Sequence, residues 1–457
     1  MSLQDVHGQR VSTDQPEVLA LYQRSLTQFH SLRMDPVATL QPALEMDPDF
    51  ISGHLLMAGL MLSACDARVL PMAQQSIAAA AASHRTPNPR ESSLLAALQP
   101  WCADGDMGRS NALLGRHLVD HPRDLFALQL THMADLVLGQ PTLLRDRIGR
   151  ALAHWSAADA GYGYVLGLHA FGLEECNEYD RALEAGHAAL ARDPGDAWAV
   201  HAVAHVYEMQ GRTEDGIDWL TRGNTHWQGD NMLAVHNWWH LALQHLRAGD
   251  EASALAIYDR VIAPNDNSMA LDLVDASGLL WRLMLRGVDA GEARWQALAA
   301  RWRAWAQPGW STFNDNHALL AQIGAGSAEG VDAVGMAMAA QAAASPAPAW
   351  QQAPALAAAM RAFGEARYGD CAHGLFALLH HDLGYGGSQA QRGLLHQTAA
   401  EAARRAGDTA LFDALRNEAA ARLPGDGATT AAQQQRARVQ PLRSADASAP
   451  QRQSLAA

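Results

Sequence analysis

The stretch DAWAVHAVAHVYEMQGRTEDGIDWL, residues 196–220, reads as a helix, a turn at Gly211 and a second helix. Apolar Val200, Val203 and Ala204 recur at the i, i+3 and i+4 positions of one helical face. A glycine after such a run is typical of a helix C-cap, where a left-handed residue stops the helix. The stretch therefore predicts a helical hairpin whose first helix buries one face.

The same helix–turn–helix pattern recurs along the chain at intervals of 34 to 45 residues. A period of about 34 residues with a turn between two helices indicates tetratricopeptide repeats, and signals for β-structure are almost absent. We therefore expect an all-α, tetratricopeptide-like right-handed solenoid of about ten helical hairpins over 1–423, strongly curved around an inner cavity. Helical patterns at 17–35 and 55–83 predict two hairpins before the first turn glycine. The turn residues predicted to end the first helix of a hairpin are Gly105, Gly139, Asn177, Gly211, Gly249, Gly287, Gly324, Gly369 and Gly407.

The last part of the chain has a different composition. Residues 424–457 lack large apolar residues at helical spacing and are rich in Ala, Gln, Ser, Pro and Arg. Such a composition does not bury enough apolar surface to order a segment. We expect a disordered tail whose removal after residue 423 leaves folding unchanged.

Charge and hydropathy exclude two classes of partner. The 457 residues carry 34 basic and 48 acidic side chains, a formal charge of −14, which favours neither nucleic acid nor an anionic membrane. The longest apolar stretch, 55–65, is shorter than the roughly 20 residues of a membrane-spanning helix, and the start MSLQDVHGQR lacks an apolar signal core. Widely spread cysteines without a CxxC pair predict reduced thiols and a cytoplasmic location. They are Cys65, Cys102, Cys176 and Cys371.

Two neighbouring repeats carry a polar stripe beside the apolar packing face. His201, His205 and Glu208 stand at i, i+4 and i+7 of the opening helix, and His236 and His240 stand at i and i+4 in the next hairpin. In tetratricopeptide arrays this stripe of the first helix lines the concave wall. Since equivalent first-helix positions of adjacent repeats are neighbours, we expect these five side chains to converge.

Other polar and aromatic residues fall at corresponding inner positions. Ten of the 13 tryptophans lie within 198–310, which predicts large aromatic walls in the central region. The glycine-rich turn at 384–387 is followed by an arginine on a helix. The further candidates for ligand binding are Tyr164, Glu174, Glu175, Asn237, Trp239, Asn314, Asp315, His317 and Arg392.

Several blocks resemble the tetratricopeptide repeat protein 38 family over roughly 1–423. The resemblance implies an all-helical repeat fold and assigns no biochemical activity. The family's C-terminal block resembles GGSHAQRD, whereas Gln389 and Gly393 replace the histidine and the acid here, so any role of those two positions is not carried over. The blocks are AFGLEE (170–175), WAVHAVAHVYEMQGR (198–212), GIDWL (216–220), HNWWHLALQHL (236–246), DASGLLWRL (275–283) and GYGGSQAQR (384–392).

The histidines permit three interpretations. With 21 histidines in the chain, chance gives about one HxxxH pair, and three occur; His117 and His121, before Pro122, form the pair we attribute to chance. The other four histidines with Glu208 can bind zinc or another divalent metal that prefers imidazole. They can instead hydrogen-bond to one another, Glu208 and Asn237, or anchor a ligand. A thermolysin-type HExxH motif is absent.

The function expected from these patterns is binding of a small molecule or an extended peptide in a His- and Trp-lined interior. The alternative is an enzyme, a hydrolase with a metal or a His/Glu acid–base cluster in the same interior. A pure protein-interaction scaffold is the third possibility. The candidate catalytic residues are His201, His205, Glu208, His236 and His240, and the candidate metal ligands are the four histidines among them.

Overall fold

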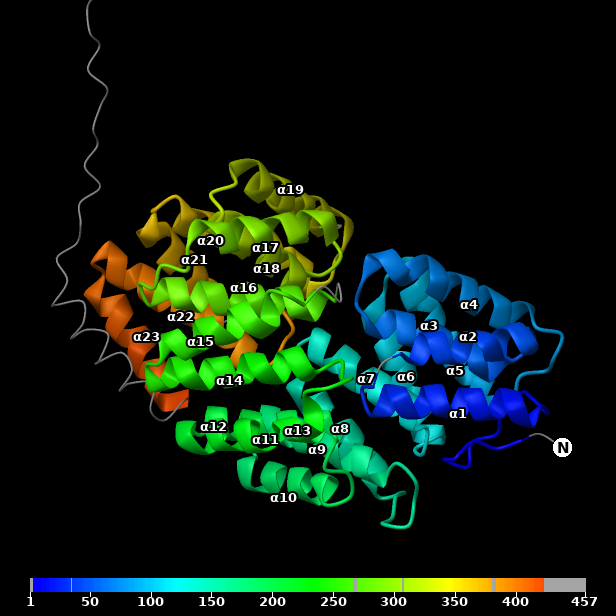
Figure 1. The fold of residues 1–457 in the computed structure, drawn as a ribbon. Helices are drawn as coiled ribbons and strands as arrows, with labels where there is room; N and C mark the ends of the chain where they lie inside the picture. The colour runs from blue at the N-terminus through cyan, green and yellow to red at the C-terminus, as the bar shows by residue number, and fades with distance from the viewer. Residues whose placement is uncertain (1–2, 34, 266–268, 306–307, 380–383, 423–457) are drawn as a thin grey trace, which may run out of the picture.

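The computed structural model describes residues 3–33, 35–265, 269–305, 308–379 and 384–422, and helices dominate it (Figure 1). Strand-like pairing in these residues is limited to two isolated bridges, Gln4 with Arg10 and Arg33 with Asn231. The predicted tail, 424–457, lies outside the described residues. The eleven hairpins are α1–α2 (Pro16–His30, Pro36–Met46), α3–α4 (Ile51–Ser63, Leu70–Ala82), α5–α6 (Pro89–Asp104, Met107–Asp120), α7–α8 (Leu125–Val137, Pro141–Leu152), α9–α10 (Tyr162–Glu175, Tyr179–Leu190), α11–α12 (Ala197–Met209, Thr213–Arg222), α14–α15 (Ala234–Ala248, Glu251–Ile257), α16–α17 (Ala270–Leu285, Glu292–Trp305), α18–α19 (Thr312–Gly324, Ala328–Ala344), α20–α21 (Pro348–Gly364, Tyr368–Leu379) and α22–α23 (Gln389–Ala406, Thr409–Arg422).

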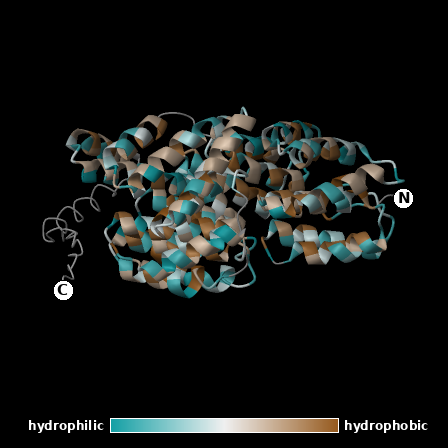
Figure 2. Cartoon of the chain, turned by 90° about the horizontal axis from the view of Figure 1, so that it is seen from above, coloured by the Kyte–Doolittle hydropathy of each residue, from teal (hydrophilic) through white to brown (hydrophobic). Residues whose placement is uncertain are grey.

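These hairpins form an all-α solenoid, as predicted. Both helices of a hairpin pack on each other, and most first helices also pack on the first helix of the next hairpin, as α9 does on α11 and α16 on α18. A short helix, α13 (Asn224–Trp227), fills the connection before α14. Figure 2 shows polar and apolar residues mixed along the helices, as expected where each helix buries only part of its surface.

Seven of the nine predicted turn residues are confirmed. Each follows the first helix of its hairpin with a left-handed backbone, the conformation that glycine and asparagine tolerate best. The two N-terminal hairpins turn at Leu32 and Cys65, with φ of 55° and 49°, so the glycine pattern does not reveal them. The seven are Gly105, Gly139, Asn177, Gly211, Gly249, Gly287 and Gly407.

Of the other two, Gly324 ends α18 as predicted but is not the left-handed residue of its turn, and the prediction for Gly369 is wrong. Gly324 is the last residue of α18, and a Cβ atom there would lie 2.2 Å from the Trp295 ring, so close packing requires this glycine. The left-handed residue of that turn is Gly326. Gly369 lies inside α21, and Ala366 takes the left-handed position before it with φ of 57°.

The array curls so far that α22 lies across the inner side of earlier hairpins. It packs on α16 and touches α11, as well as its own neighbour α21. Trp281 Nε1–H of α16 donates to Thr398 Oγ1 of α22 at 2.9 Å, and Arg282 donates to the Ala390 carbonyl at 2.7 Å. Figure 1 shows the N-terminal hairpins α1–α6 on one side of the molecule and α8–α23 on the other, with α7 between them.

Two expectations about the chemistry of the chain hold in the described residues. No helix there combines the length and apolar character needed to cross a membrane. None of the four cysteines is bonded to another.

A buried histidine in the first hairpin predicts a pH dependence of stability. His30 Nδ1 lies 2.6 Å from Gln129 Oε1 of α7, and burial, with a smaller effect of His7, lowers the pKa of His30 to about 3. Since the unfolded ring titrates near 6.5, this neutral imidazole stabilises the fold above pH ~6.5, and the stabilisation is lost as pH falls below that value. The slope for one such group reaches about 1.4 kcal/mol per pH unit.

We therefore expect His30→Gln to flatten the fall in unfolding free energy between pH 6.5 and pH 4.5, measured by urea denaturation. The matched control is His154→Gln, at an exposed position. Equal slopes for the wild type and His30→Gln would contradict the prediction.

Candidate metal centre

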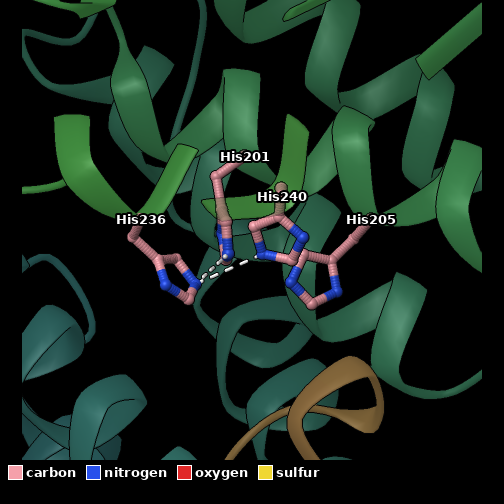
Figure 3. A group of neighbouring side chains, drawn as sticks. All are labelled: His201, His205, His236 and His240. Carbon is pink, nitrogen blue, oxygen red and sulfur yellow. Dashed lines mark hydrogen bonds between the residues drawn. The ribbon is translucent and has the colours of Figure 1, made fainter. Parts of the chain in front are cut away.

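Two first helices position the histidines. Asp196 caps α11, accepting hydrogen bonds from the backbone N–H groups of Trp198 and Ala199 at 3.0 Å each. The polar stripe of α11 then faces that of α14, because the first helices of successive hairpins pack side by side. Figure 3 shows the four imidazoles of these helices pointing toward one another.

The imidazole nitrogens meet at hydrogen-bond distance. Nε2 of His236 lies 3.1 Å from Nε2 of His201 and 3.2 Å from Nε2 of His240. The His205 ring centroid is 4.4 Å from those of His201 and His240. All four rings are buried, and one nitrogen of each lies within 4.8 Å of the others.

Two of these rings bond to a carboxylate through the nitrogen that faces away from the cluster. His236 Nδ1 lies 2.9 Å from an oxygen of Asp275, and His240 Nδ1 lies 2.9 Å from Glu208 Oε2. His205 Nδ1 lies 3.3 Å from Glu174 Oε2, but the two atoms do not form a hydrogen bond. A carboxylate beside Nδ1 fixes the single proton of a neutral imidazole there, so Nε2 keeps a free lone pair.

The contact between His236 and His240 is therefore unusual. In the tautomer in which each Nδ1–H donates to its carboxylate, the Nε2 lone pairs of the two rings face each other at 3.2 Å. A proton on His201 can bridge its own contact to His236 but leaves this one unbridged. A cation between the lone pairs converts this repulsion into coordination.

Burial favours the neutral form of three of the imidazoles. It lowers the pKa of His201 and of His240 well below the usual range, with neighbouring histidines as the next cause. Burial also lowers the pKa of His205 to about 4. Neutral imidazole is the form that binds a metal, so these ligands need not lose a proton near pH 7.

The carboxyl groups show the opposite shift. Burial, and secondarily the charge of Glu208, raise the pKa of Glu174 well above its usual value. The pKa of Asp275 is also raised by burial, and His236 opposes that shift. A nearby cation would favour the charged form of both carboxyl groups.

Several buried polar atoms at the centre have no hydrogen-bond partner. Both carboxylate oxygens of Glu174, both ring nitrogens of His205 and Nδ1 of His201 are in this state; the two amide atoms of Asn237, next to His236 in sequence, are also unpaired. Buried polar atoms are almost always paired. Their concentration around one point indicates a site for an ion or a polar ligand.

Aromatic rings and α22 enclose the cluster. Phe171 stacks on His201 and Trp239 on His236, each with ring centroids 5.2 Å apart. Arg392 of α22 donates to Glu175 Oε2 at 3.0 Å, which joins α22 to the end of α9. This packing fixes the orientation of the imidazoles and limits access of water.

The remaining predicted site residues separate into two groups. Glu174, Glu208, Trp239 and the four histidines come together, and Arg392 joins them through Glu175. Three others make contacts elsewhere: Tyr164 lies against His30 with ring centroids 5.9 Å apart, Asp315 accepts from the Gly309 N–H at 2.7 Å, and His317 Nδ1 lies 2.8 Å from the Phe313 carbonyl. Asn314 lies beside Asp315 in the first turn of α18 and is buried.

Sequence reasoning missed Asp275 and His132. Asp275 stands 39 residues after His236, close to one repeat, so it holds the equivalent inner position of α16. His132 of α7 stands 69 residues, or two repeats, before His201. Its ring is buried without a hydrogen-bond partner, against Phe171 and Trp198. Extending the stripe by whole repeats would have found both.

Comparison with known proteins adds little to this geometry. No protein-family model matches the chain. The crystal structure of the TPR domain of P58(IPK) is similar to it at 12% sequence identity, covering 86% of this chain and 98% of that one, with a TM-score of 0.21. A TM-score this low carries no argument about the fold, which is defined by the packing of the hairpins.

Proposed function

We propose that this chain is a helical-repeat protein that binds a divalent transition metal through Nε2 of His201, His236 and His240. The observation that supports the proposal most is the approach of Nε2 of His236 and of His240 to 3.2 Å, while Asp275 and Glu208 lie 2.9 Å from their Nδ1 atoms. Histidine ligands in metal sites almost always carry such a partner on the other ring nitrogen.

The distances fit a metal of the zinc type. Nitrogens that lie ~2.0–2.1 Å from a tetrahedral ion are separated from each other by about 3.3–3.4 Å. The observed separations of 3.1 and 3.2 Å require only small movements of the rings. Imidazole ligands suit zinc, copper, iron or nickel, whereas magnesium and calcium prefer oxygen.

A three-histidine set also favours a second function, metal-dependent hydrolysis. Three protein ligands leave one position of a tetrahedral ion for water or substrate, as in catalytic zinc sites. Glu208, 2.9 Å from His240, keeps a small exposed fraction of 7% at the edge of the cluster. An organic ligand, small molecule or peptide, in the same interior stays a prediction, as do the cytoplasmic location and membership of the tetratricopeptide repeat protein 38 family.

The test measures bound metal on the full-length chain purified without a histidine tag. We expect elemental analysis and native mass spectrometry to find a transition metal at one equivalent or more per chain. We also expect His236→Ala to weaken binding by more than the 10–100-fold typical of an outer-shell change.

The matched control is His245→Ala on the same helix, because His245 lies 3.3 Å from Asp250 at the C-terminal end of α14 and outside the cluster. A wild-type chain that takes up no zinc, cobalt, iron or copper after reconstitution would overturn the proposal.

A further inference from the structure

We propose that a second divalent cation binds beside the three-histidine centre, between His205, Glu174 and Glu175. This inference rests on the proposed metal function, since both ions would share one interior. Glu174 and Glu175 form the last turn of α9, and α11 places His205 against them. One ligand atom from each of the three lies within 4.8 Å of the others, and all three residues are buried.

Glu174 is the residue that a cation would satisfy. Its side chain is fully buried, and neither carboxylate oxygen accepts a hydrogen bond. His205 Nδ1 lies 3.3 Å from Glu174 Oε2, and neither nitrogen of that ring has a hydrogen-bond partner either. An ion between the carboxylate and the imidazole would give partners to both at once.

Glu175, unlike Glu174, accepts hydrogen bonds from other residues. The Gln389 N–H donates to its Oε1 at 2.8 Å, and Arg392 donates to its Oε2 at 3.0 Å. Each oxygen of a carboxylate can accept more than one bond, so these contacts orient the group and leave lone pairs for an ion. Both donors come from α22, so the folding back of α22 completes this second site.

The ligand chemistry differs between the two sites. The first offers three imidazoles, whereas the second offers one imidazole and two carboxylates, a set that suits zinc, iron or manganese. The His205 ring lies 4.4 Å, centroid to centroid, from His201 and from His240 of the first set. The ligands of the two sites are therefore in direct contact, as expected if the two ions share one interior.

The experiment counts ions in the full-length chain, stripped with a chelator and titrated with Zn²⁺ or Mn²⁺. We expect two equivalents in the wild type and one in Glu174→Gln, which keeps the shape of the side chain and removes its charge. Glu175→Gln provides a second variant with the same expected loss. Glu184→Gln, on the exposed side of α10, is the matched control and keeps two. Electron paramagnetic resonance of the Mn²⁺-loaded wild type is expected to show coupling between the ions, and both site variants lose it.

The outcomes separate the two proposals. One equivalent in the wild type, without magnetic coupling, overturns the second site and leaves the three-histidine centre standing. Two equivalents in the wild type and in both glutamine variants also overturn it, because the second ion would then sit elsewhere. No bound metal in any form overturns the proposed function and this inference together. Circular dichroism of each variant identifies any loss of helix that would itself lower the count.

Discussion

Saturating the stripped chain with zinc is expected to raise its free energy of unfolding by about 4 kcal/mol at free zinc 1,000-fold above the dissociation constant. The metal stabilises only the folded state, because its ligands come from α11 and α14 and meet only when the two hairpins pack. The unfolded chain holds His201 and His236 35 residues apart, without a preformed site.

Urea denaturation followed by circular dichroism, in zinc-buffered and chelated solution, measures this shift. His236→Ala is expected to lose the part of this rise that comes from the three-histidine centre, so zinc raises its unfolding midpoint less than that of the wild type. A zinc-dependent rise that persists unchanged in His236→Ala would place the stabilising metal outside the proposed centre.

Replacing Trp281 with alanine is expected to cost about 3–5 kcal/mol of stability, the range for loss of a buried large aromatic side chain. Trp281 is fully buried in α16, its Nε1–H donates to Thr398 Oγ1, and its ring lies 5.2 Å from that of Phe363. The substitution removes apolar contacts and leaves a cavity at the place where α22 meets α16. Thr398 keeps a bond to the Leu394 carbonyl at 2.8 Å, so the loss is mainly one of packing.

The control for this substitution is Met336→Ala, because 68% of Met336 is exposed. That change is expected to alter the unfolding free energy by no more than about 0.5 kcal/mol. If Trp281→Ala cost less than 1 kcal/mol, the docking of α22 on α16 would be wrong.

The sequence was sufficient to predict that five polar side chains converge, because in a repeat fold the spacing along the chain determines the position in space. These residues are His201, His205, Glu208, His236 and His240. Helical geometry places residues at i and i+4 on one face, and stacking of first helices places equivalent faces together. Both rules are local or act between adjacent repeats. The pairing of His236 with Asp275 obeys the same rule, since Asp275 continues the polar stripe into α16, one repeat further along the chain.

Features that depend on distant parts of the chain were beyond such rules. Gly324 looks like a turn glycine in sequence, yet its lack of a side chain serves contact with Trp295, which belongs to the preceding hairpin. The position of α22 depends on contacts such as Trp281 with Thr398, 117 residues apart. Such contacts have no period, so helical patterns do not predict them.

Because α22 packs back on earlier hairpins, the array is not expected to fold repeat by repeat as an ordinary solenoid does. An ordinary solenoid is stabilised by nearest-neighbour interfaces, so its repeats can be added or deleted one by one. Here the Gln389 N–H donates to Glu175, the Gly387 N–H to the Leu136 carbonyl, and the Met232 N–H to the Leu32 carbonyl, at separations of 200 residues or more. These contacts raise the contact order of the fold and connect the ends of the array to its middle. Deleting the last hairpin would therefore expose the inner faces of the central repeats, and folding of the array becomes a single cooperative event.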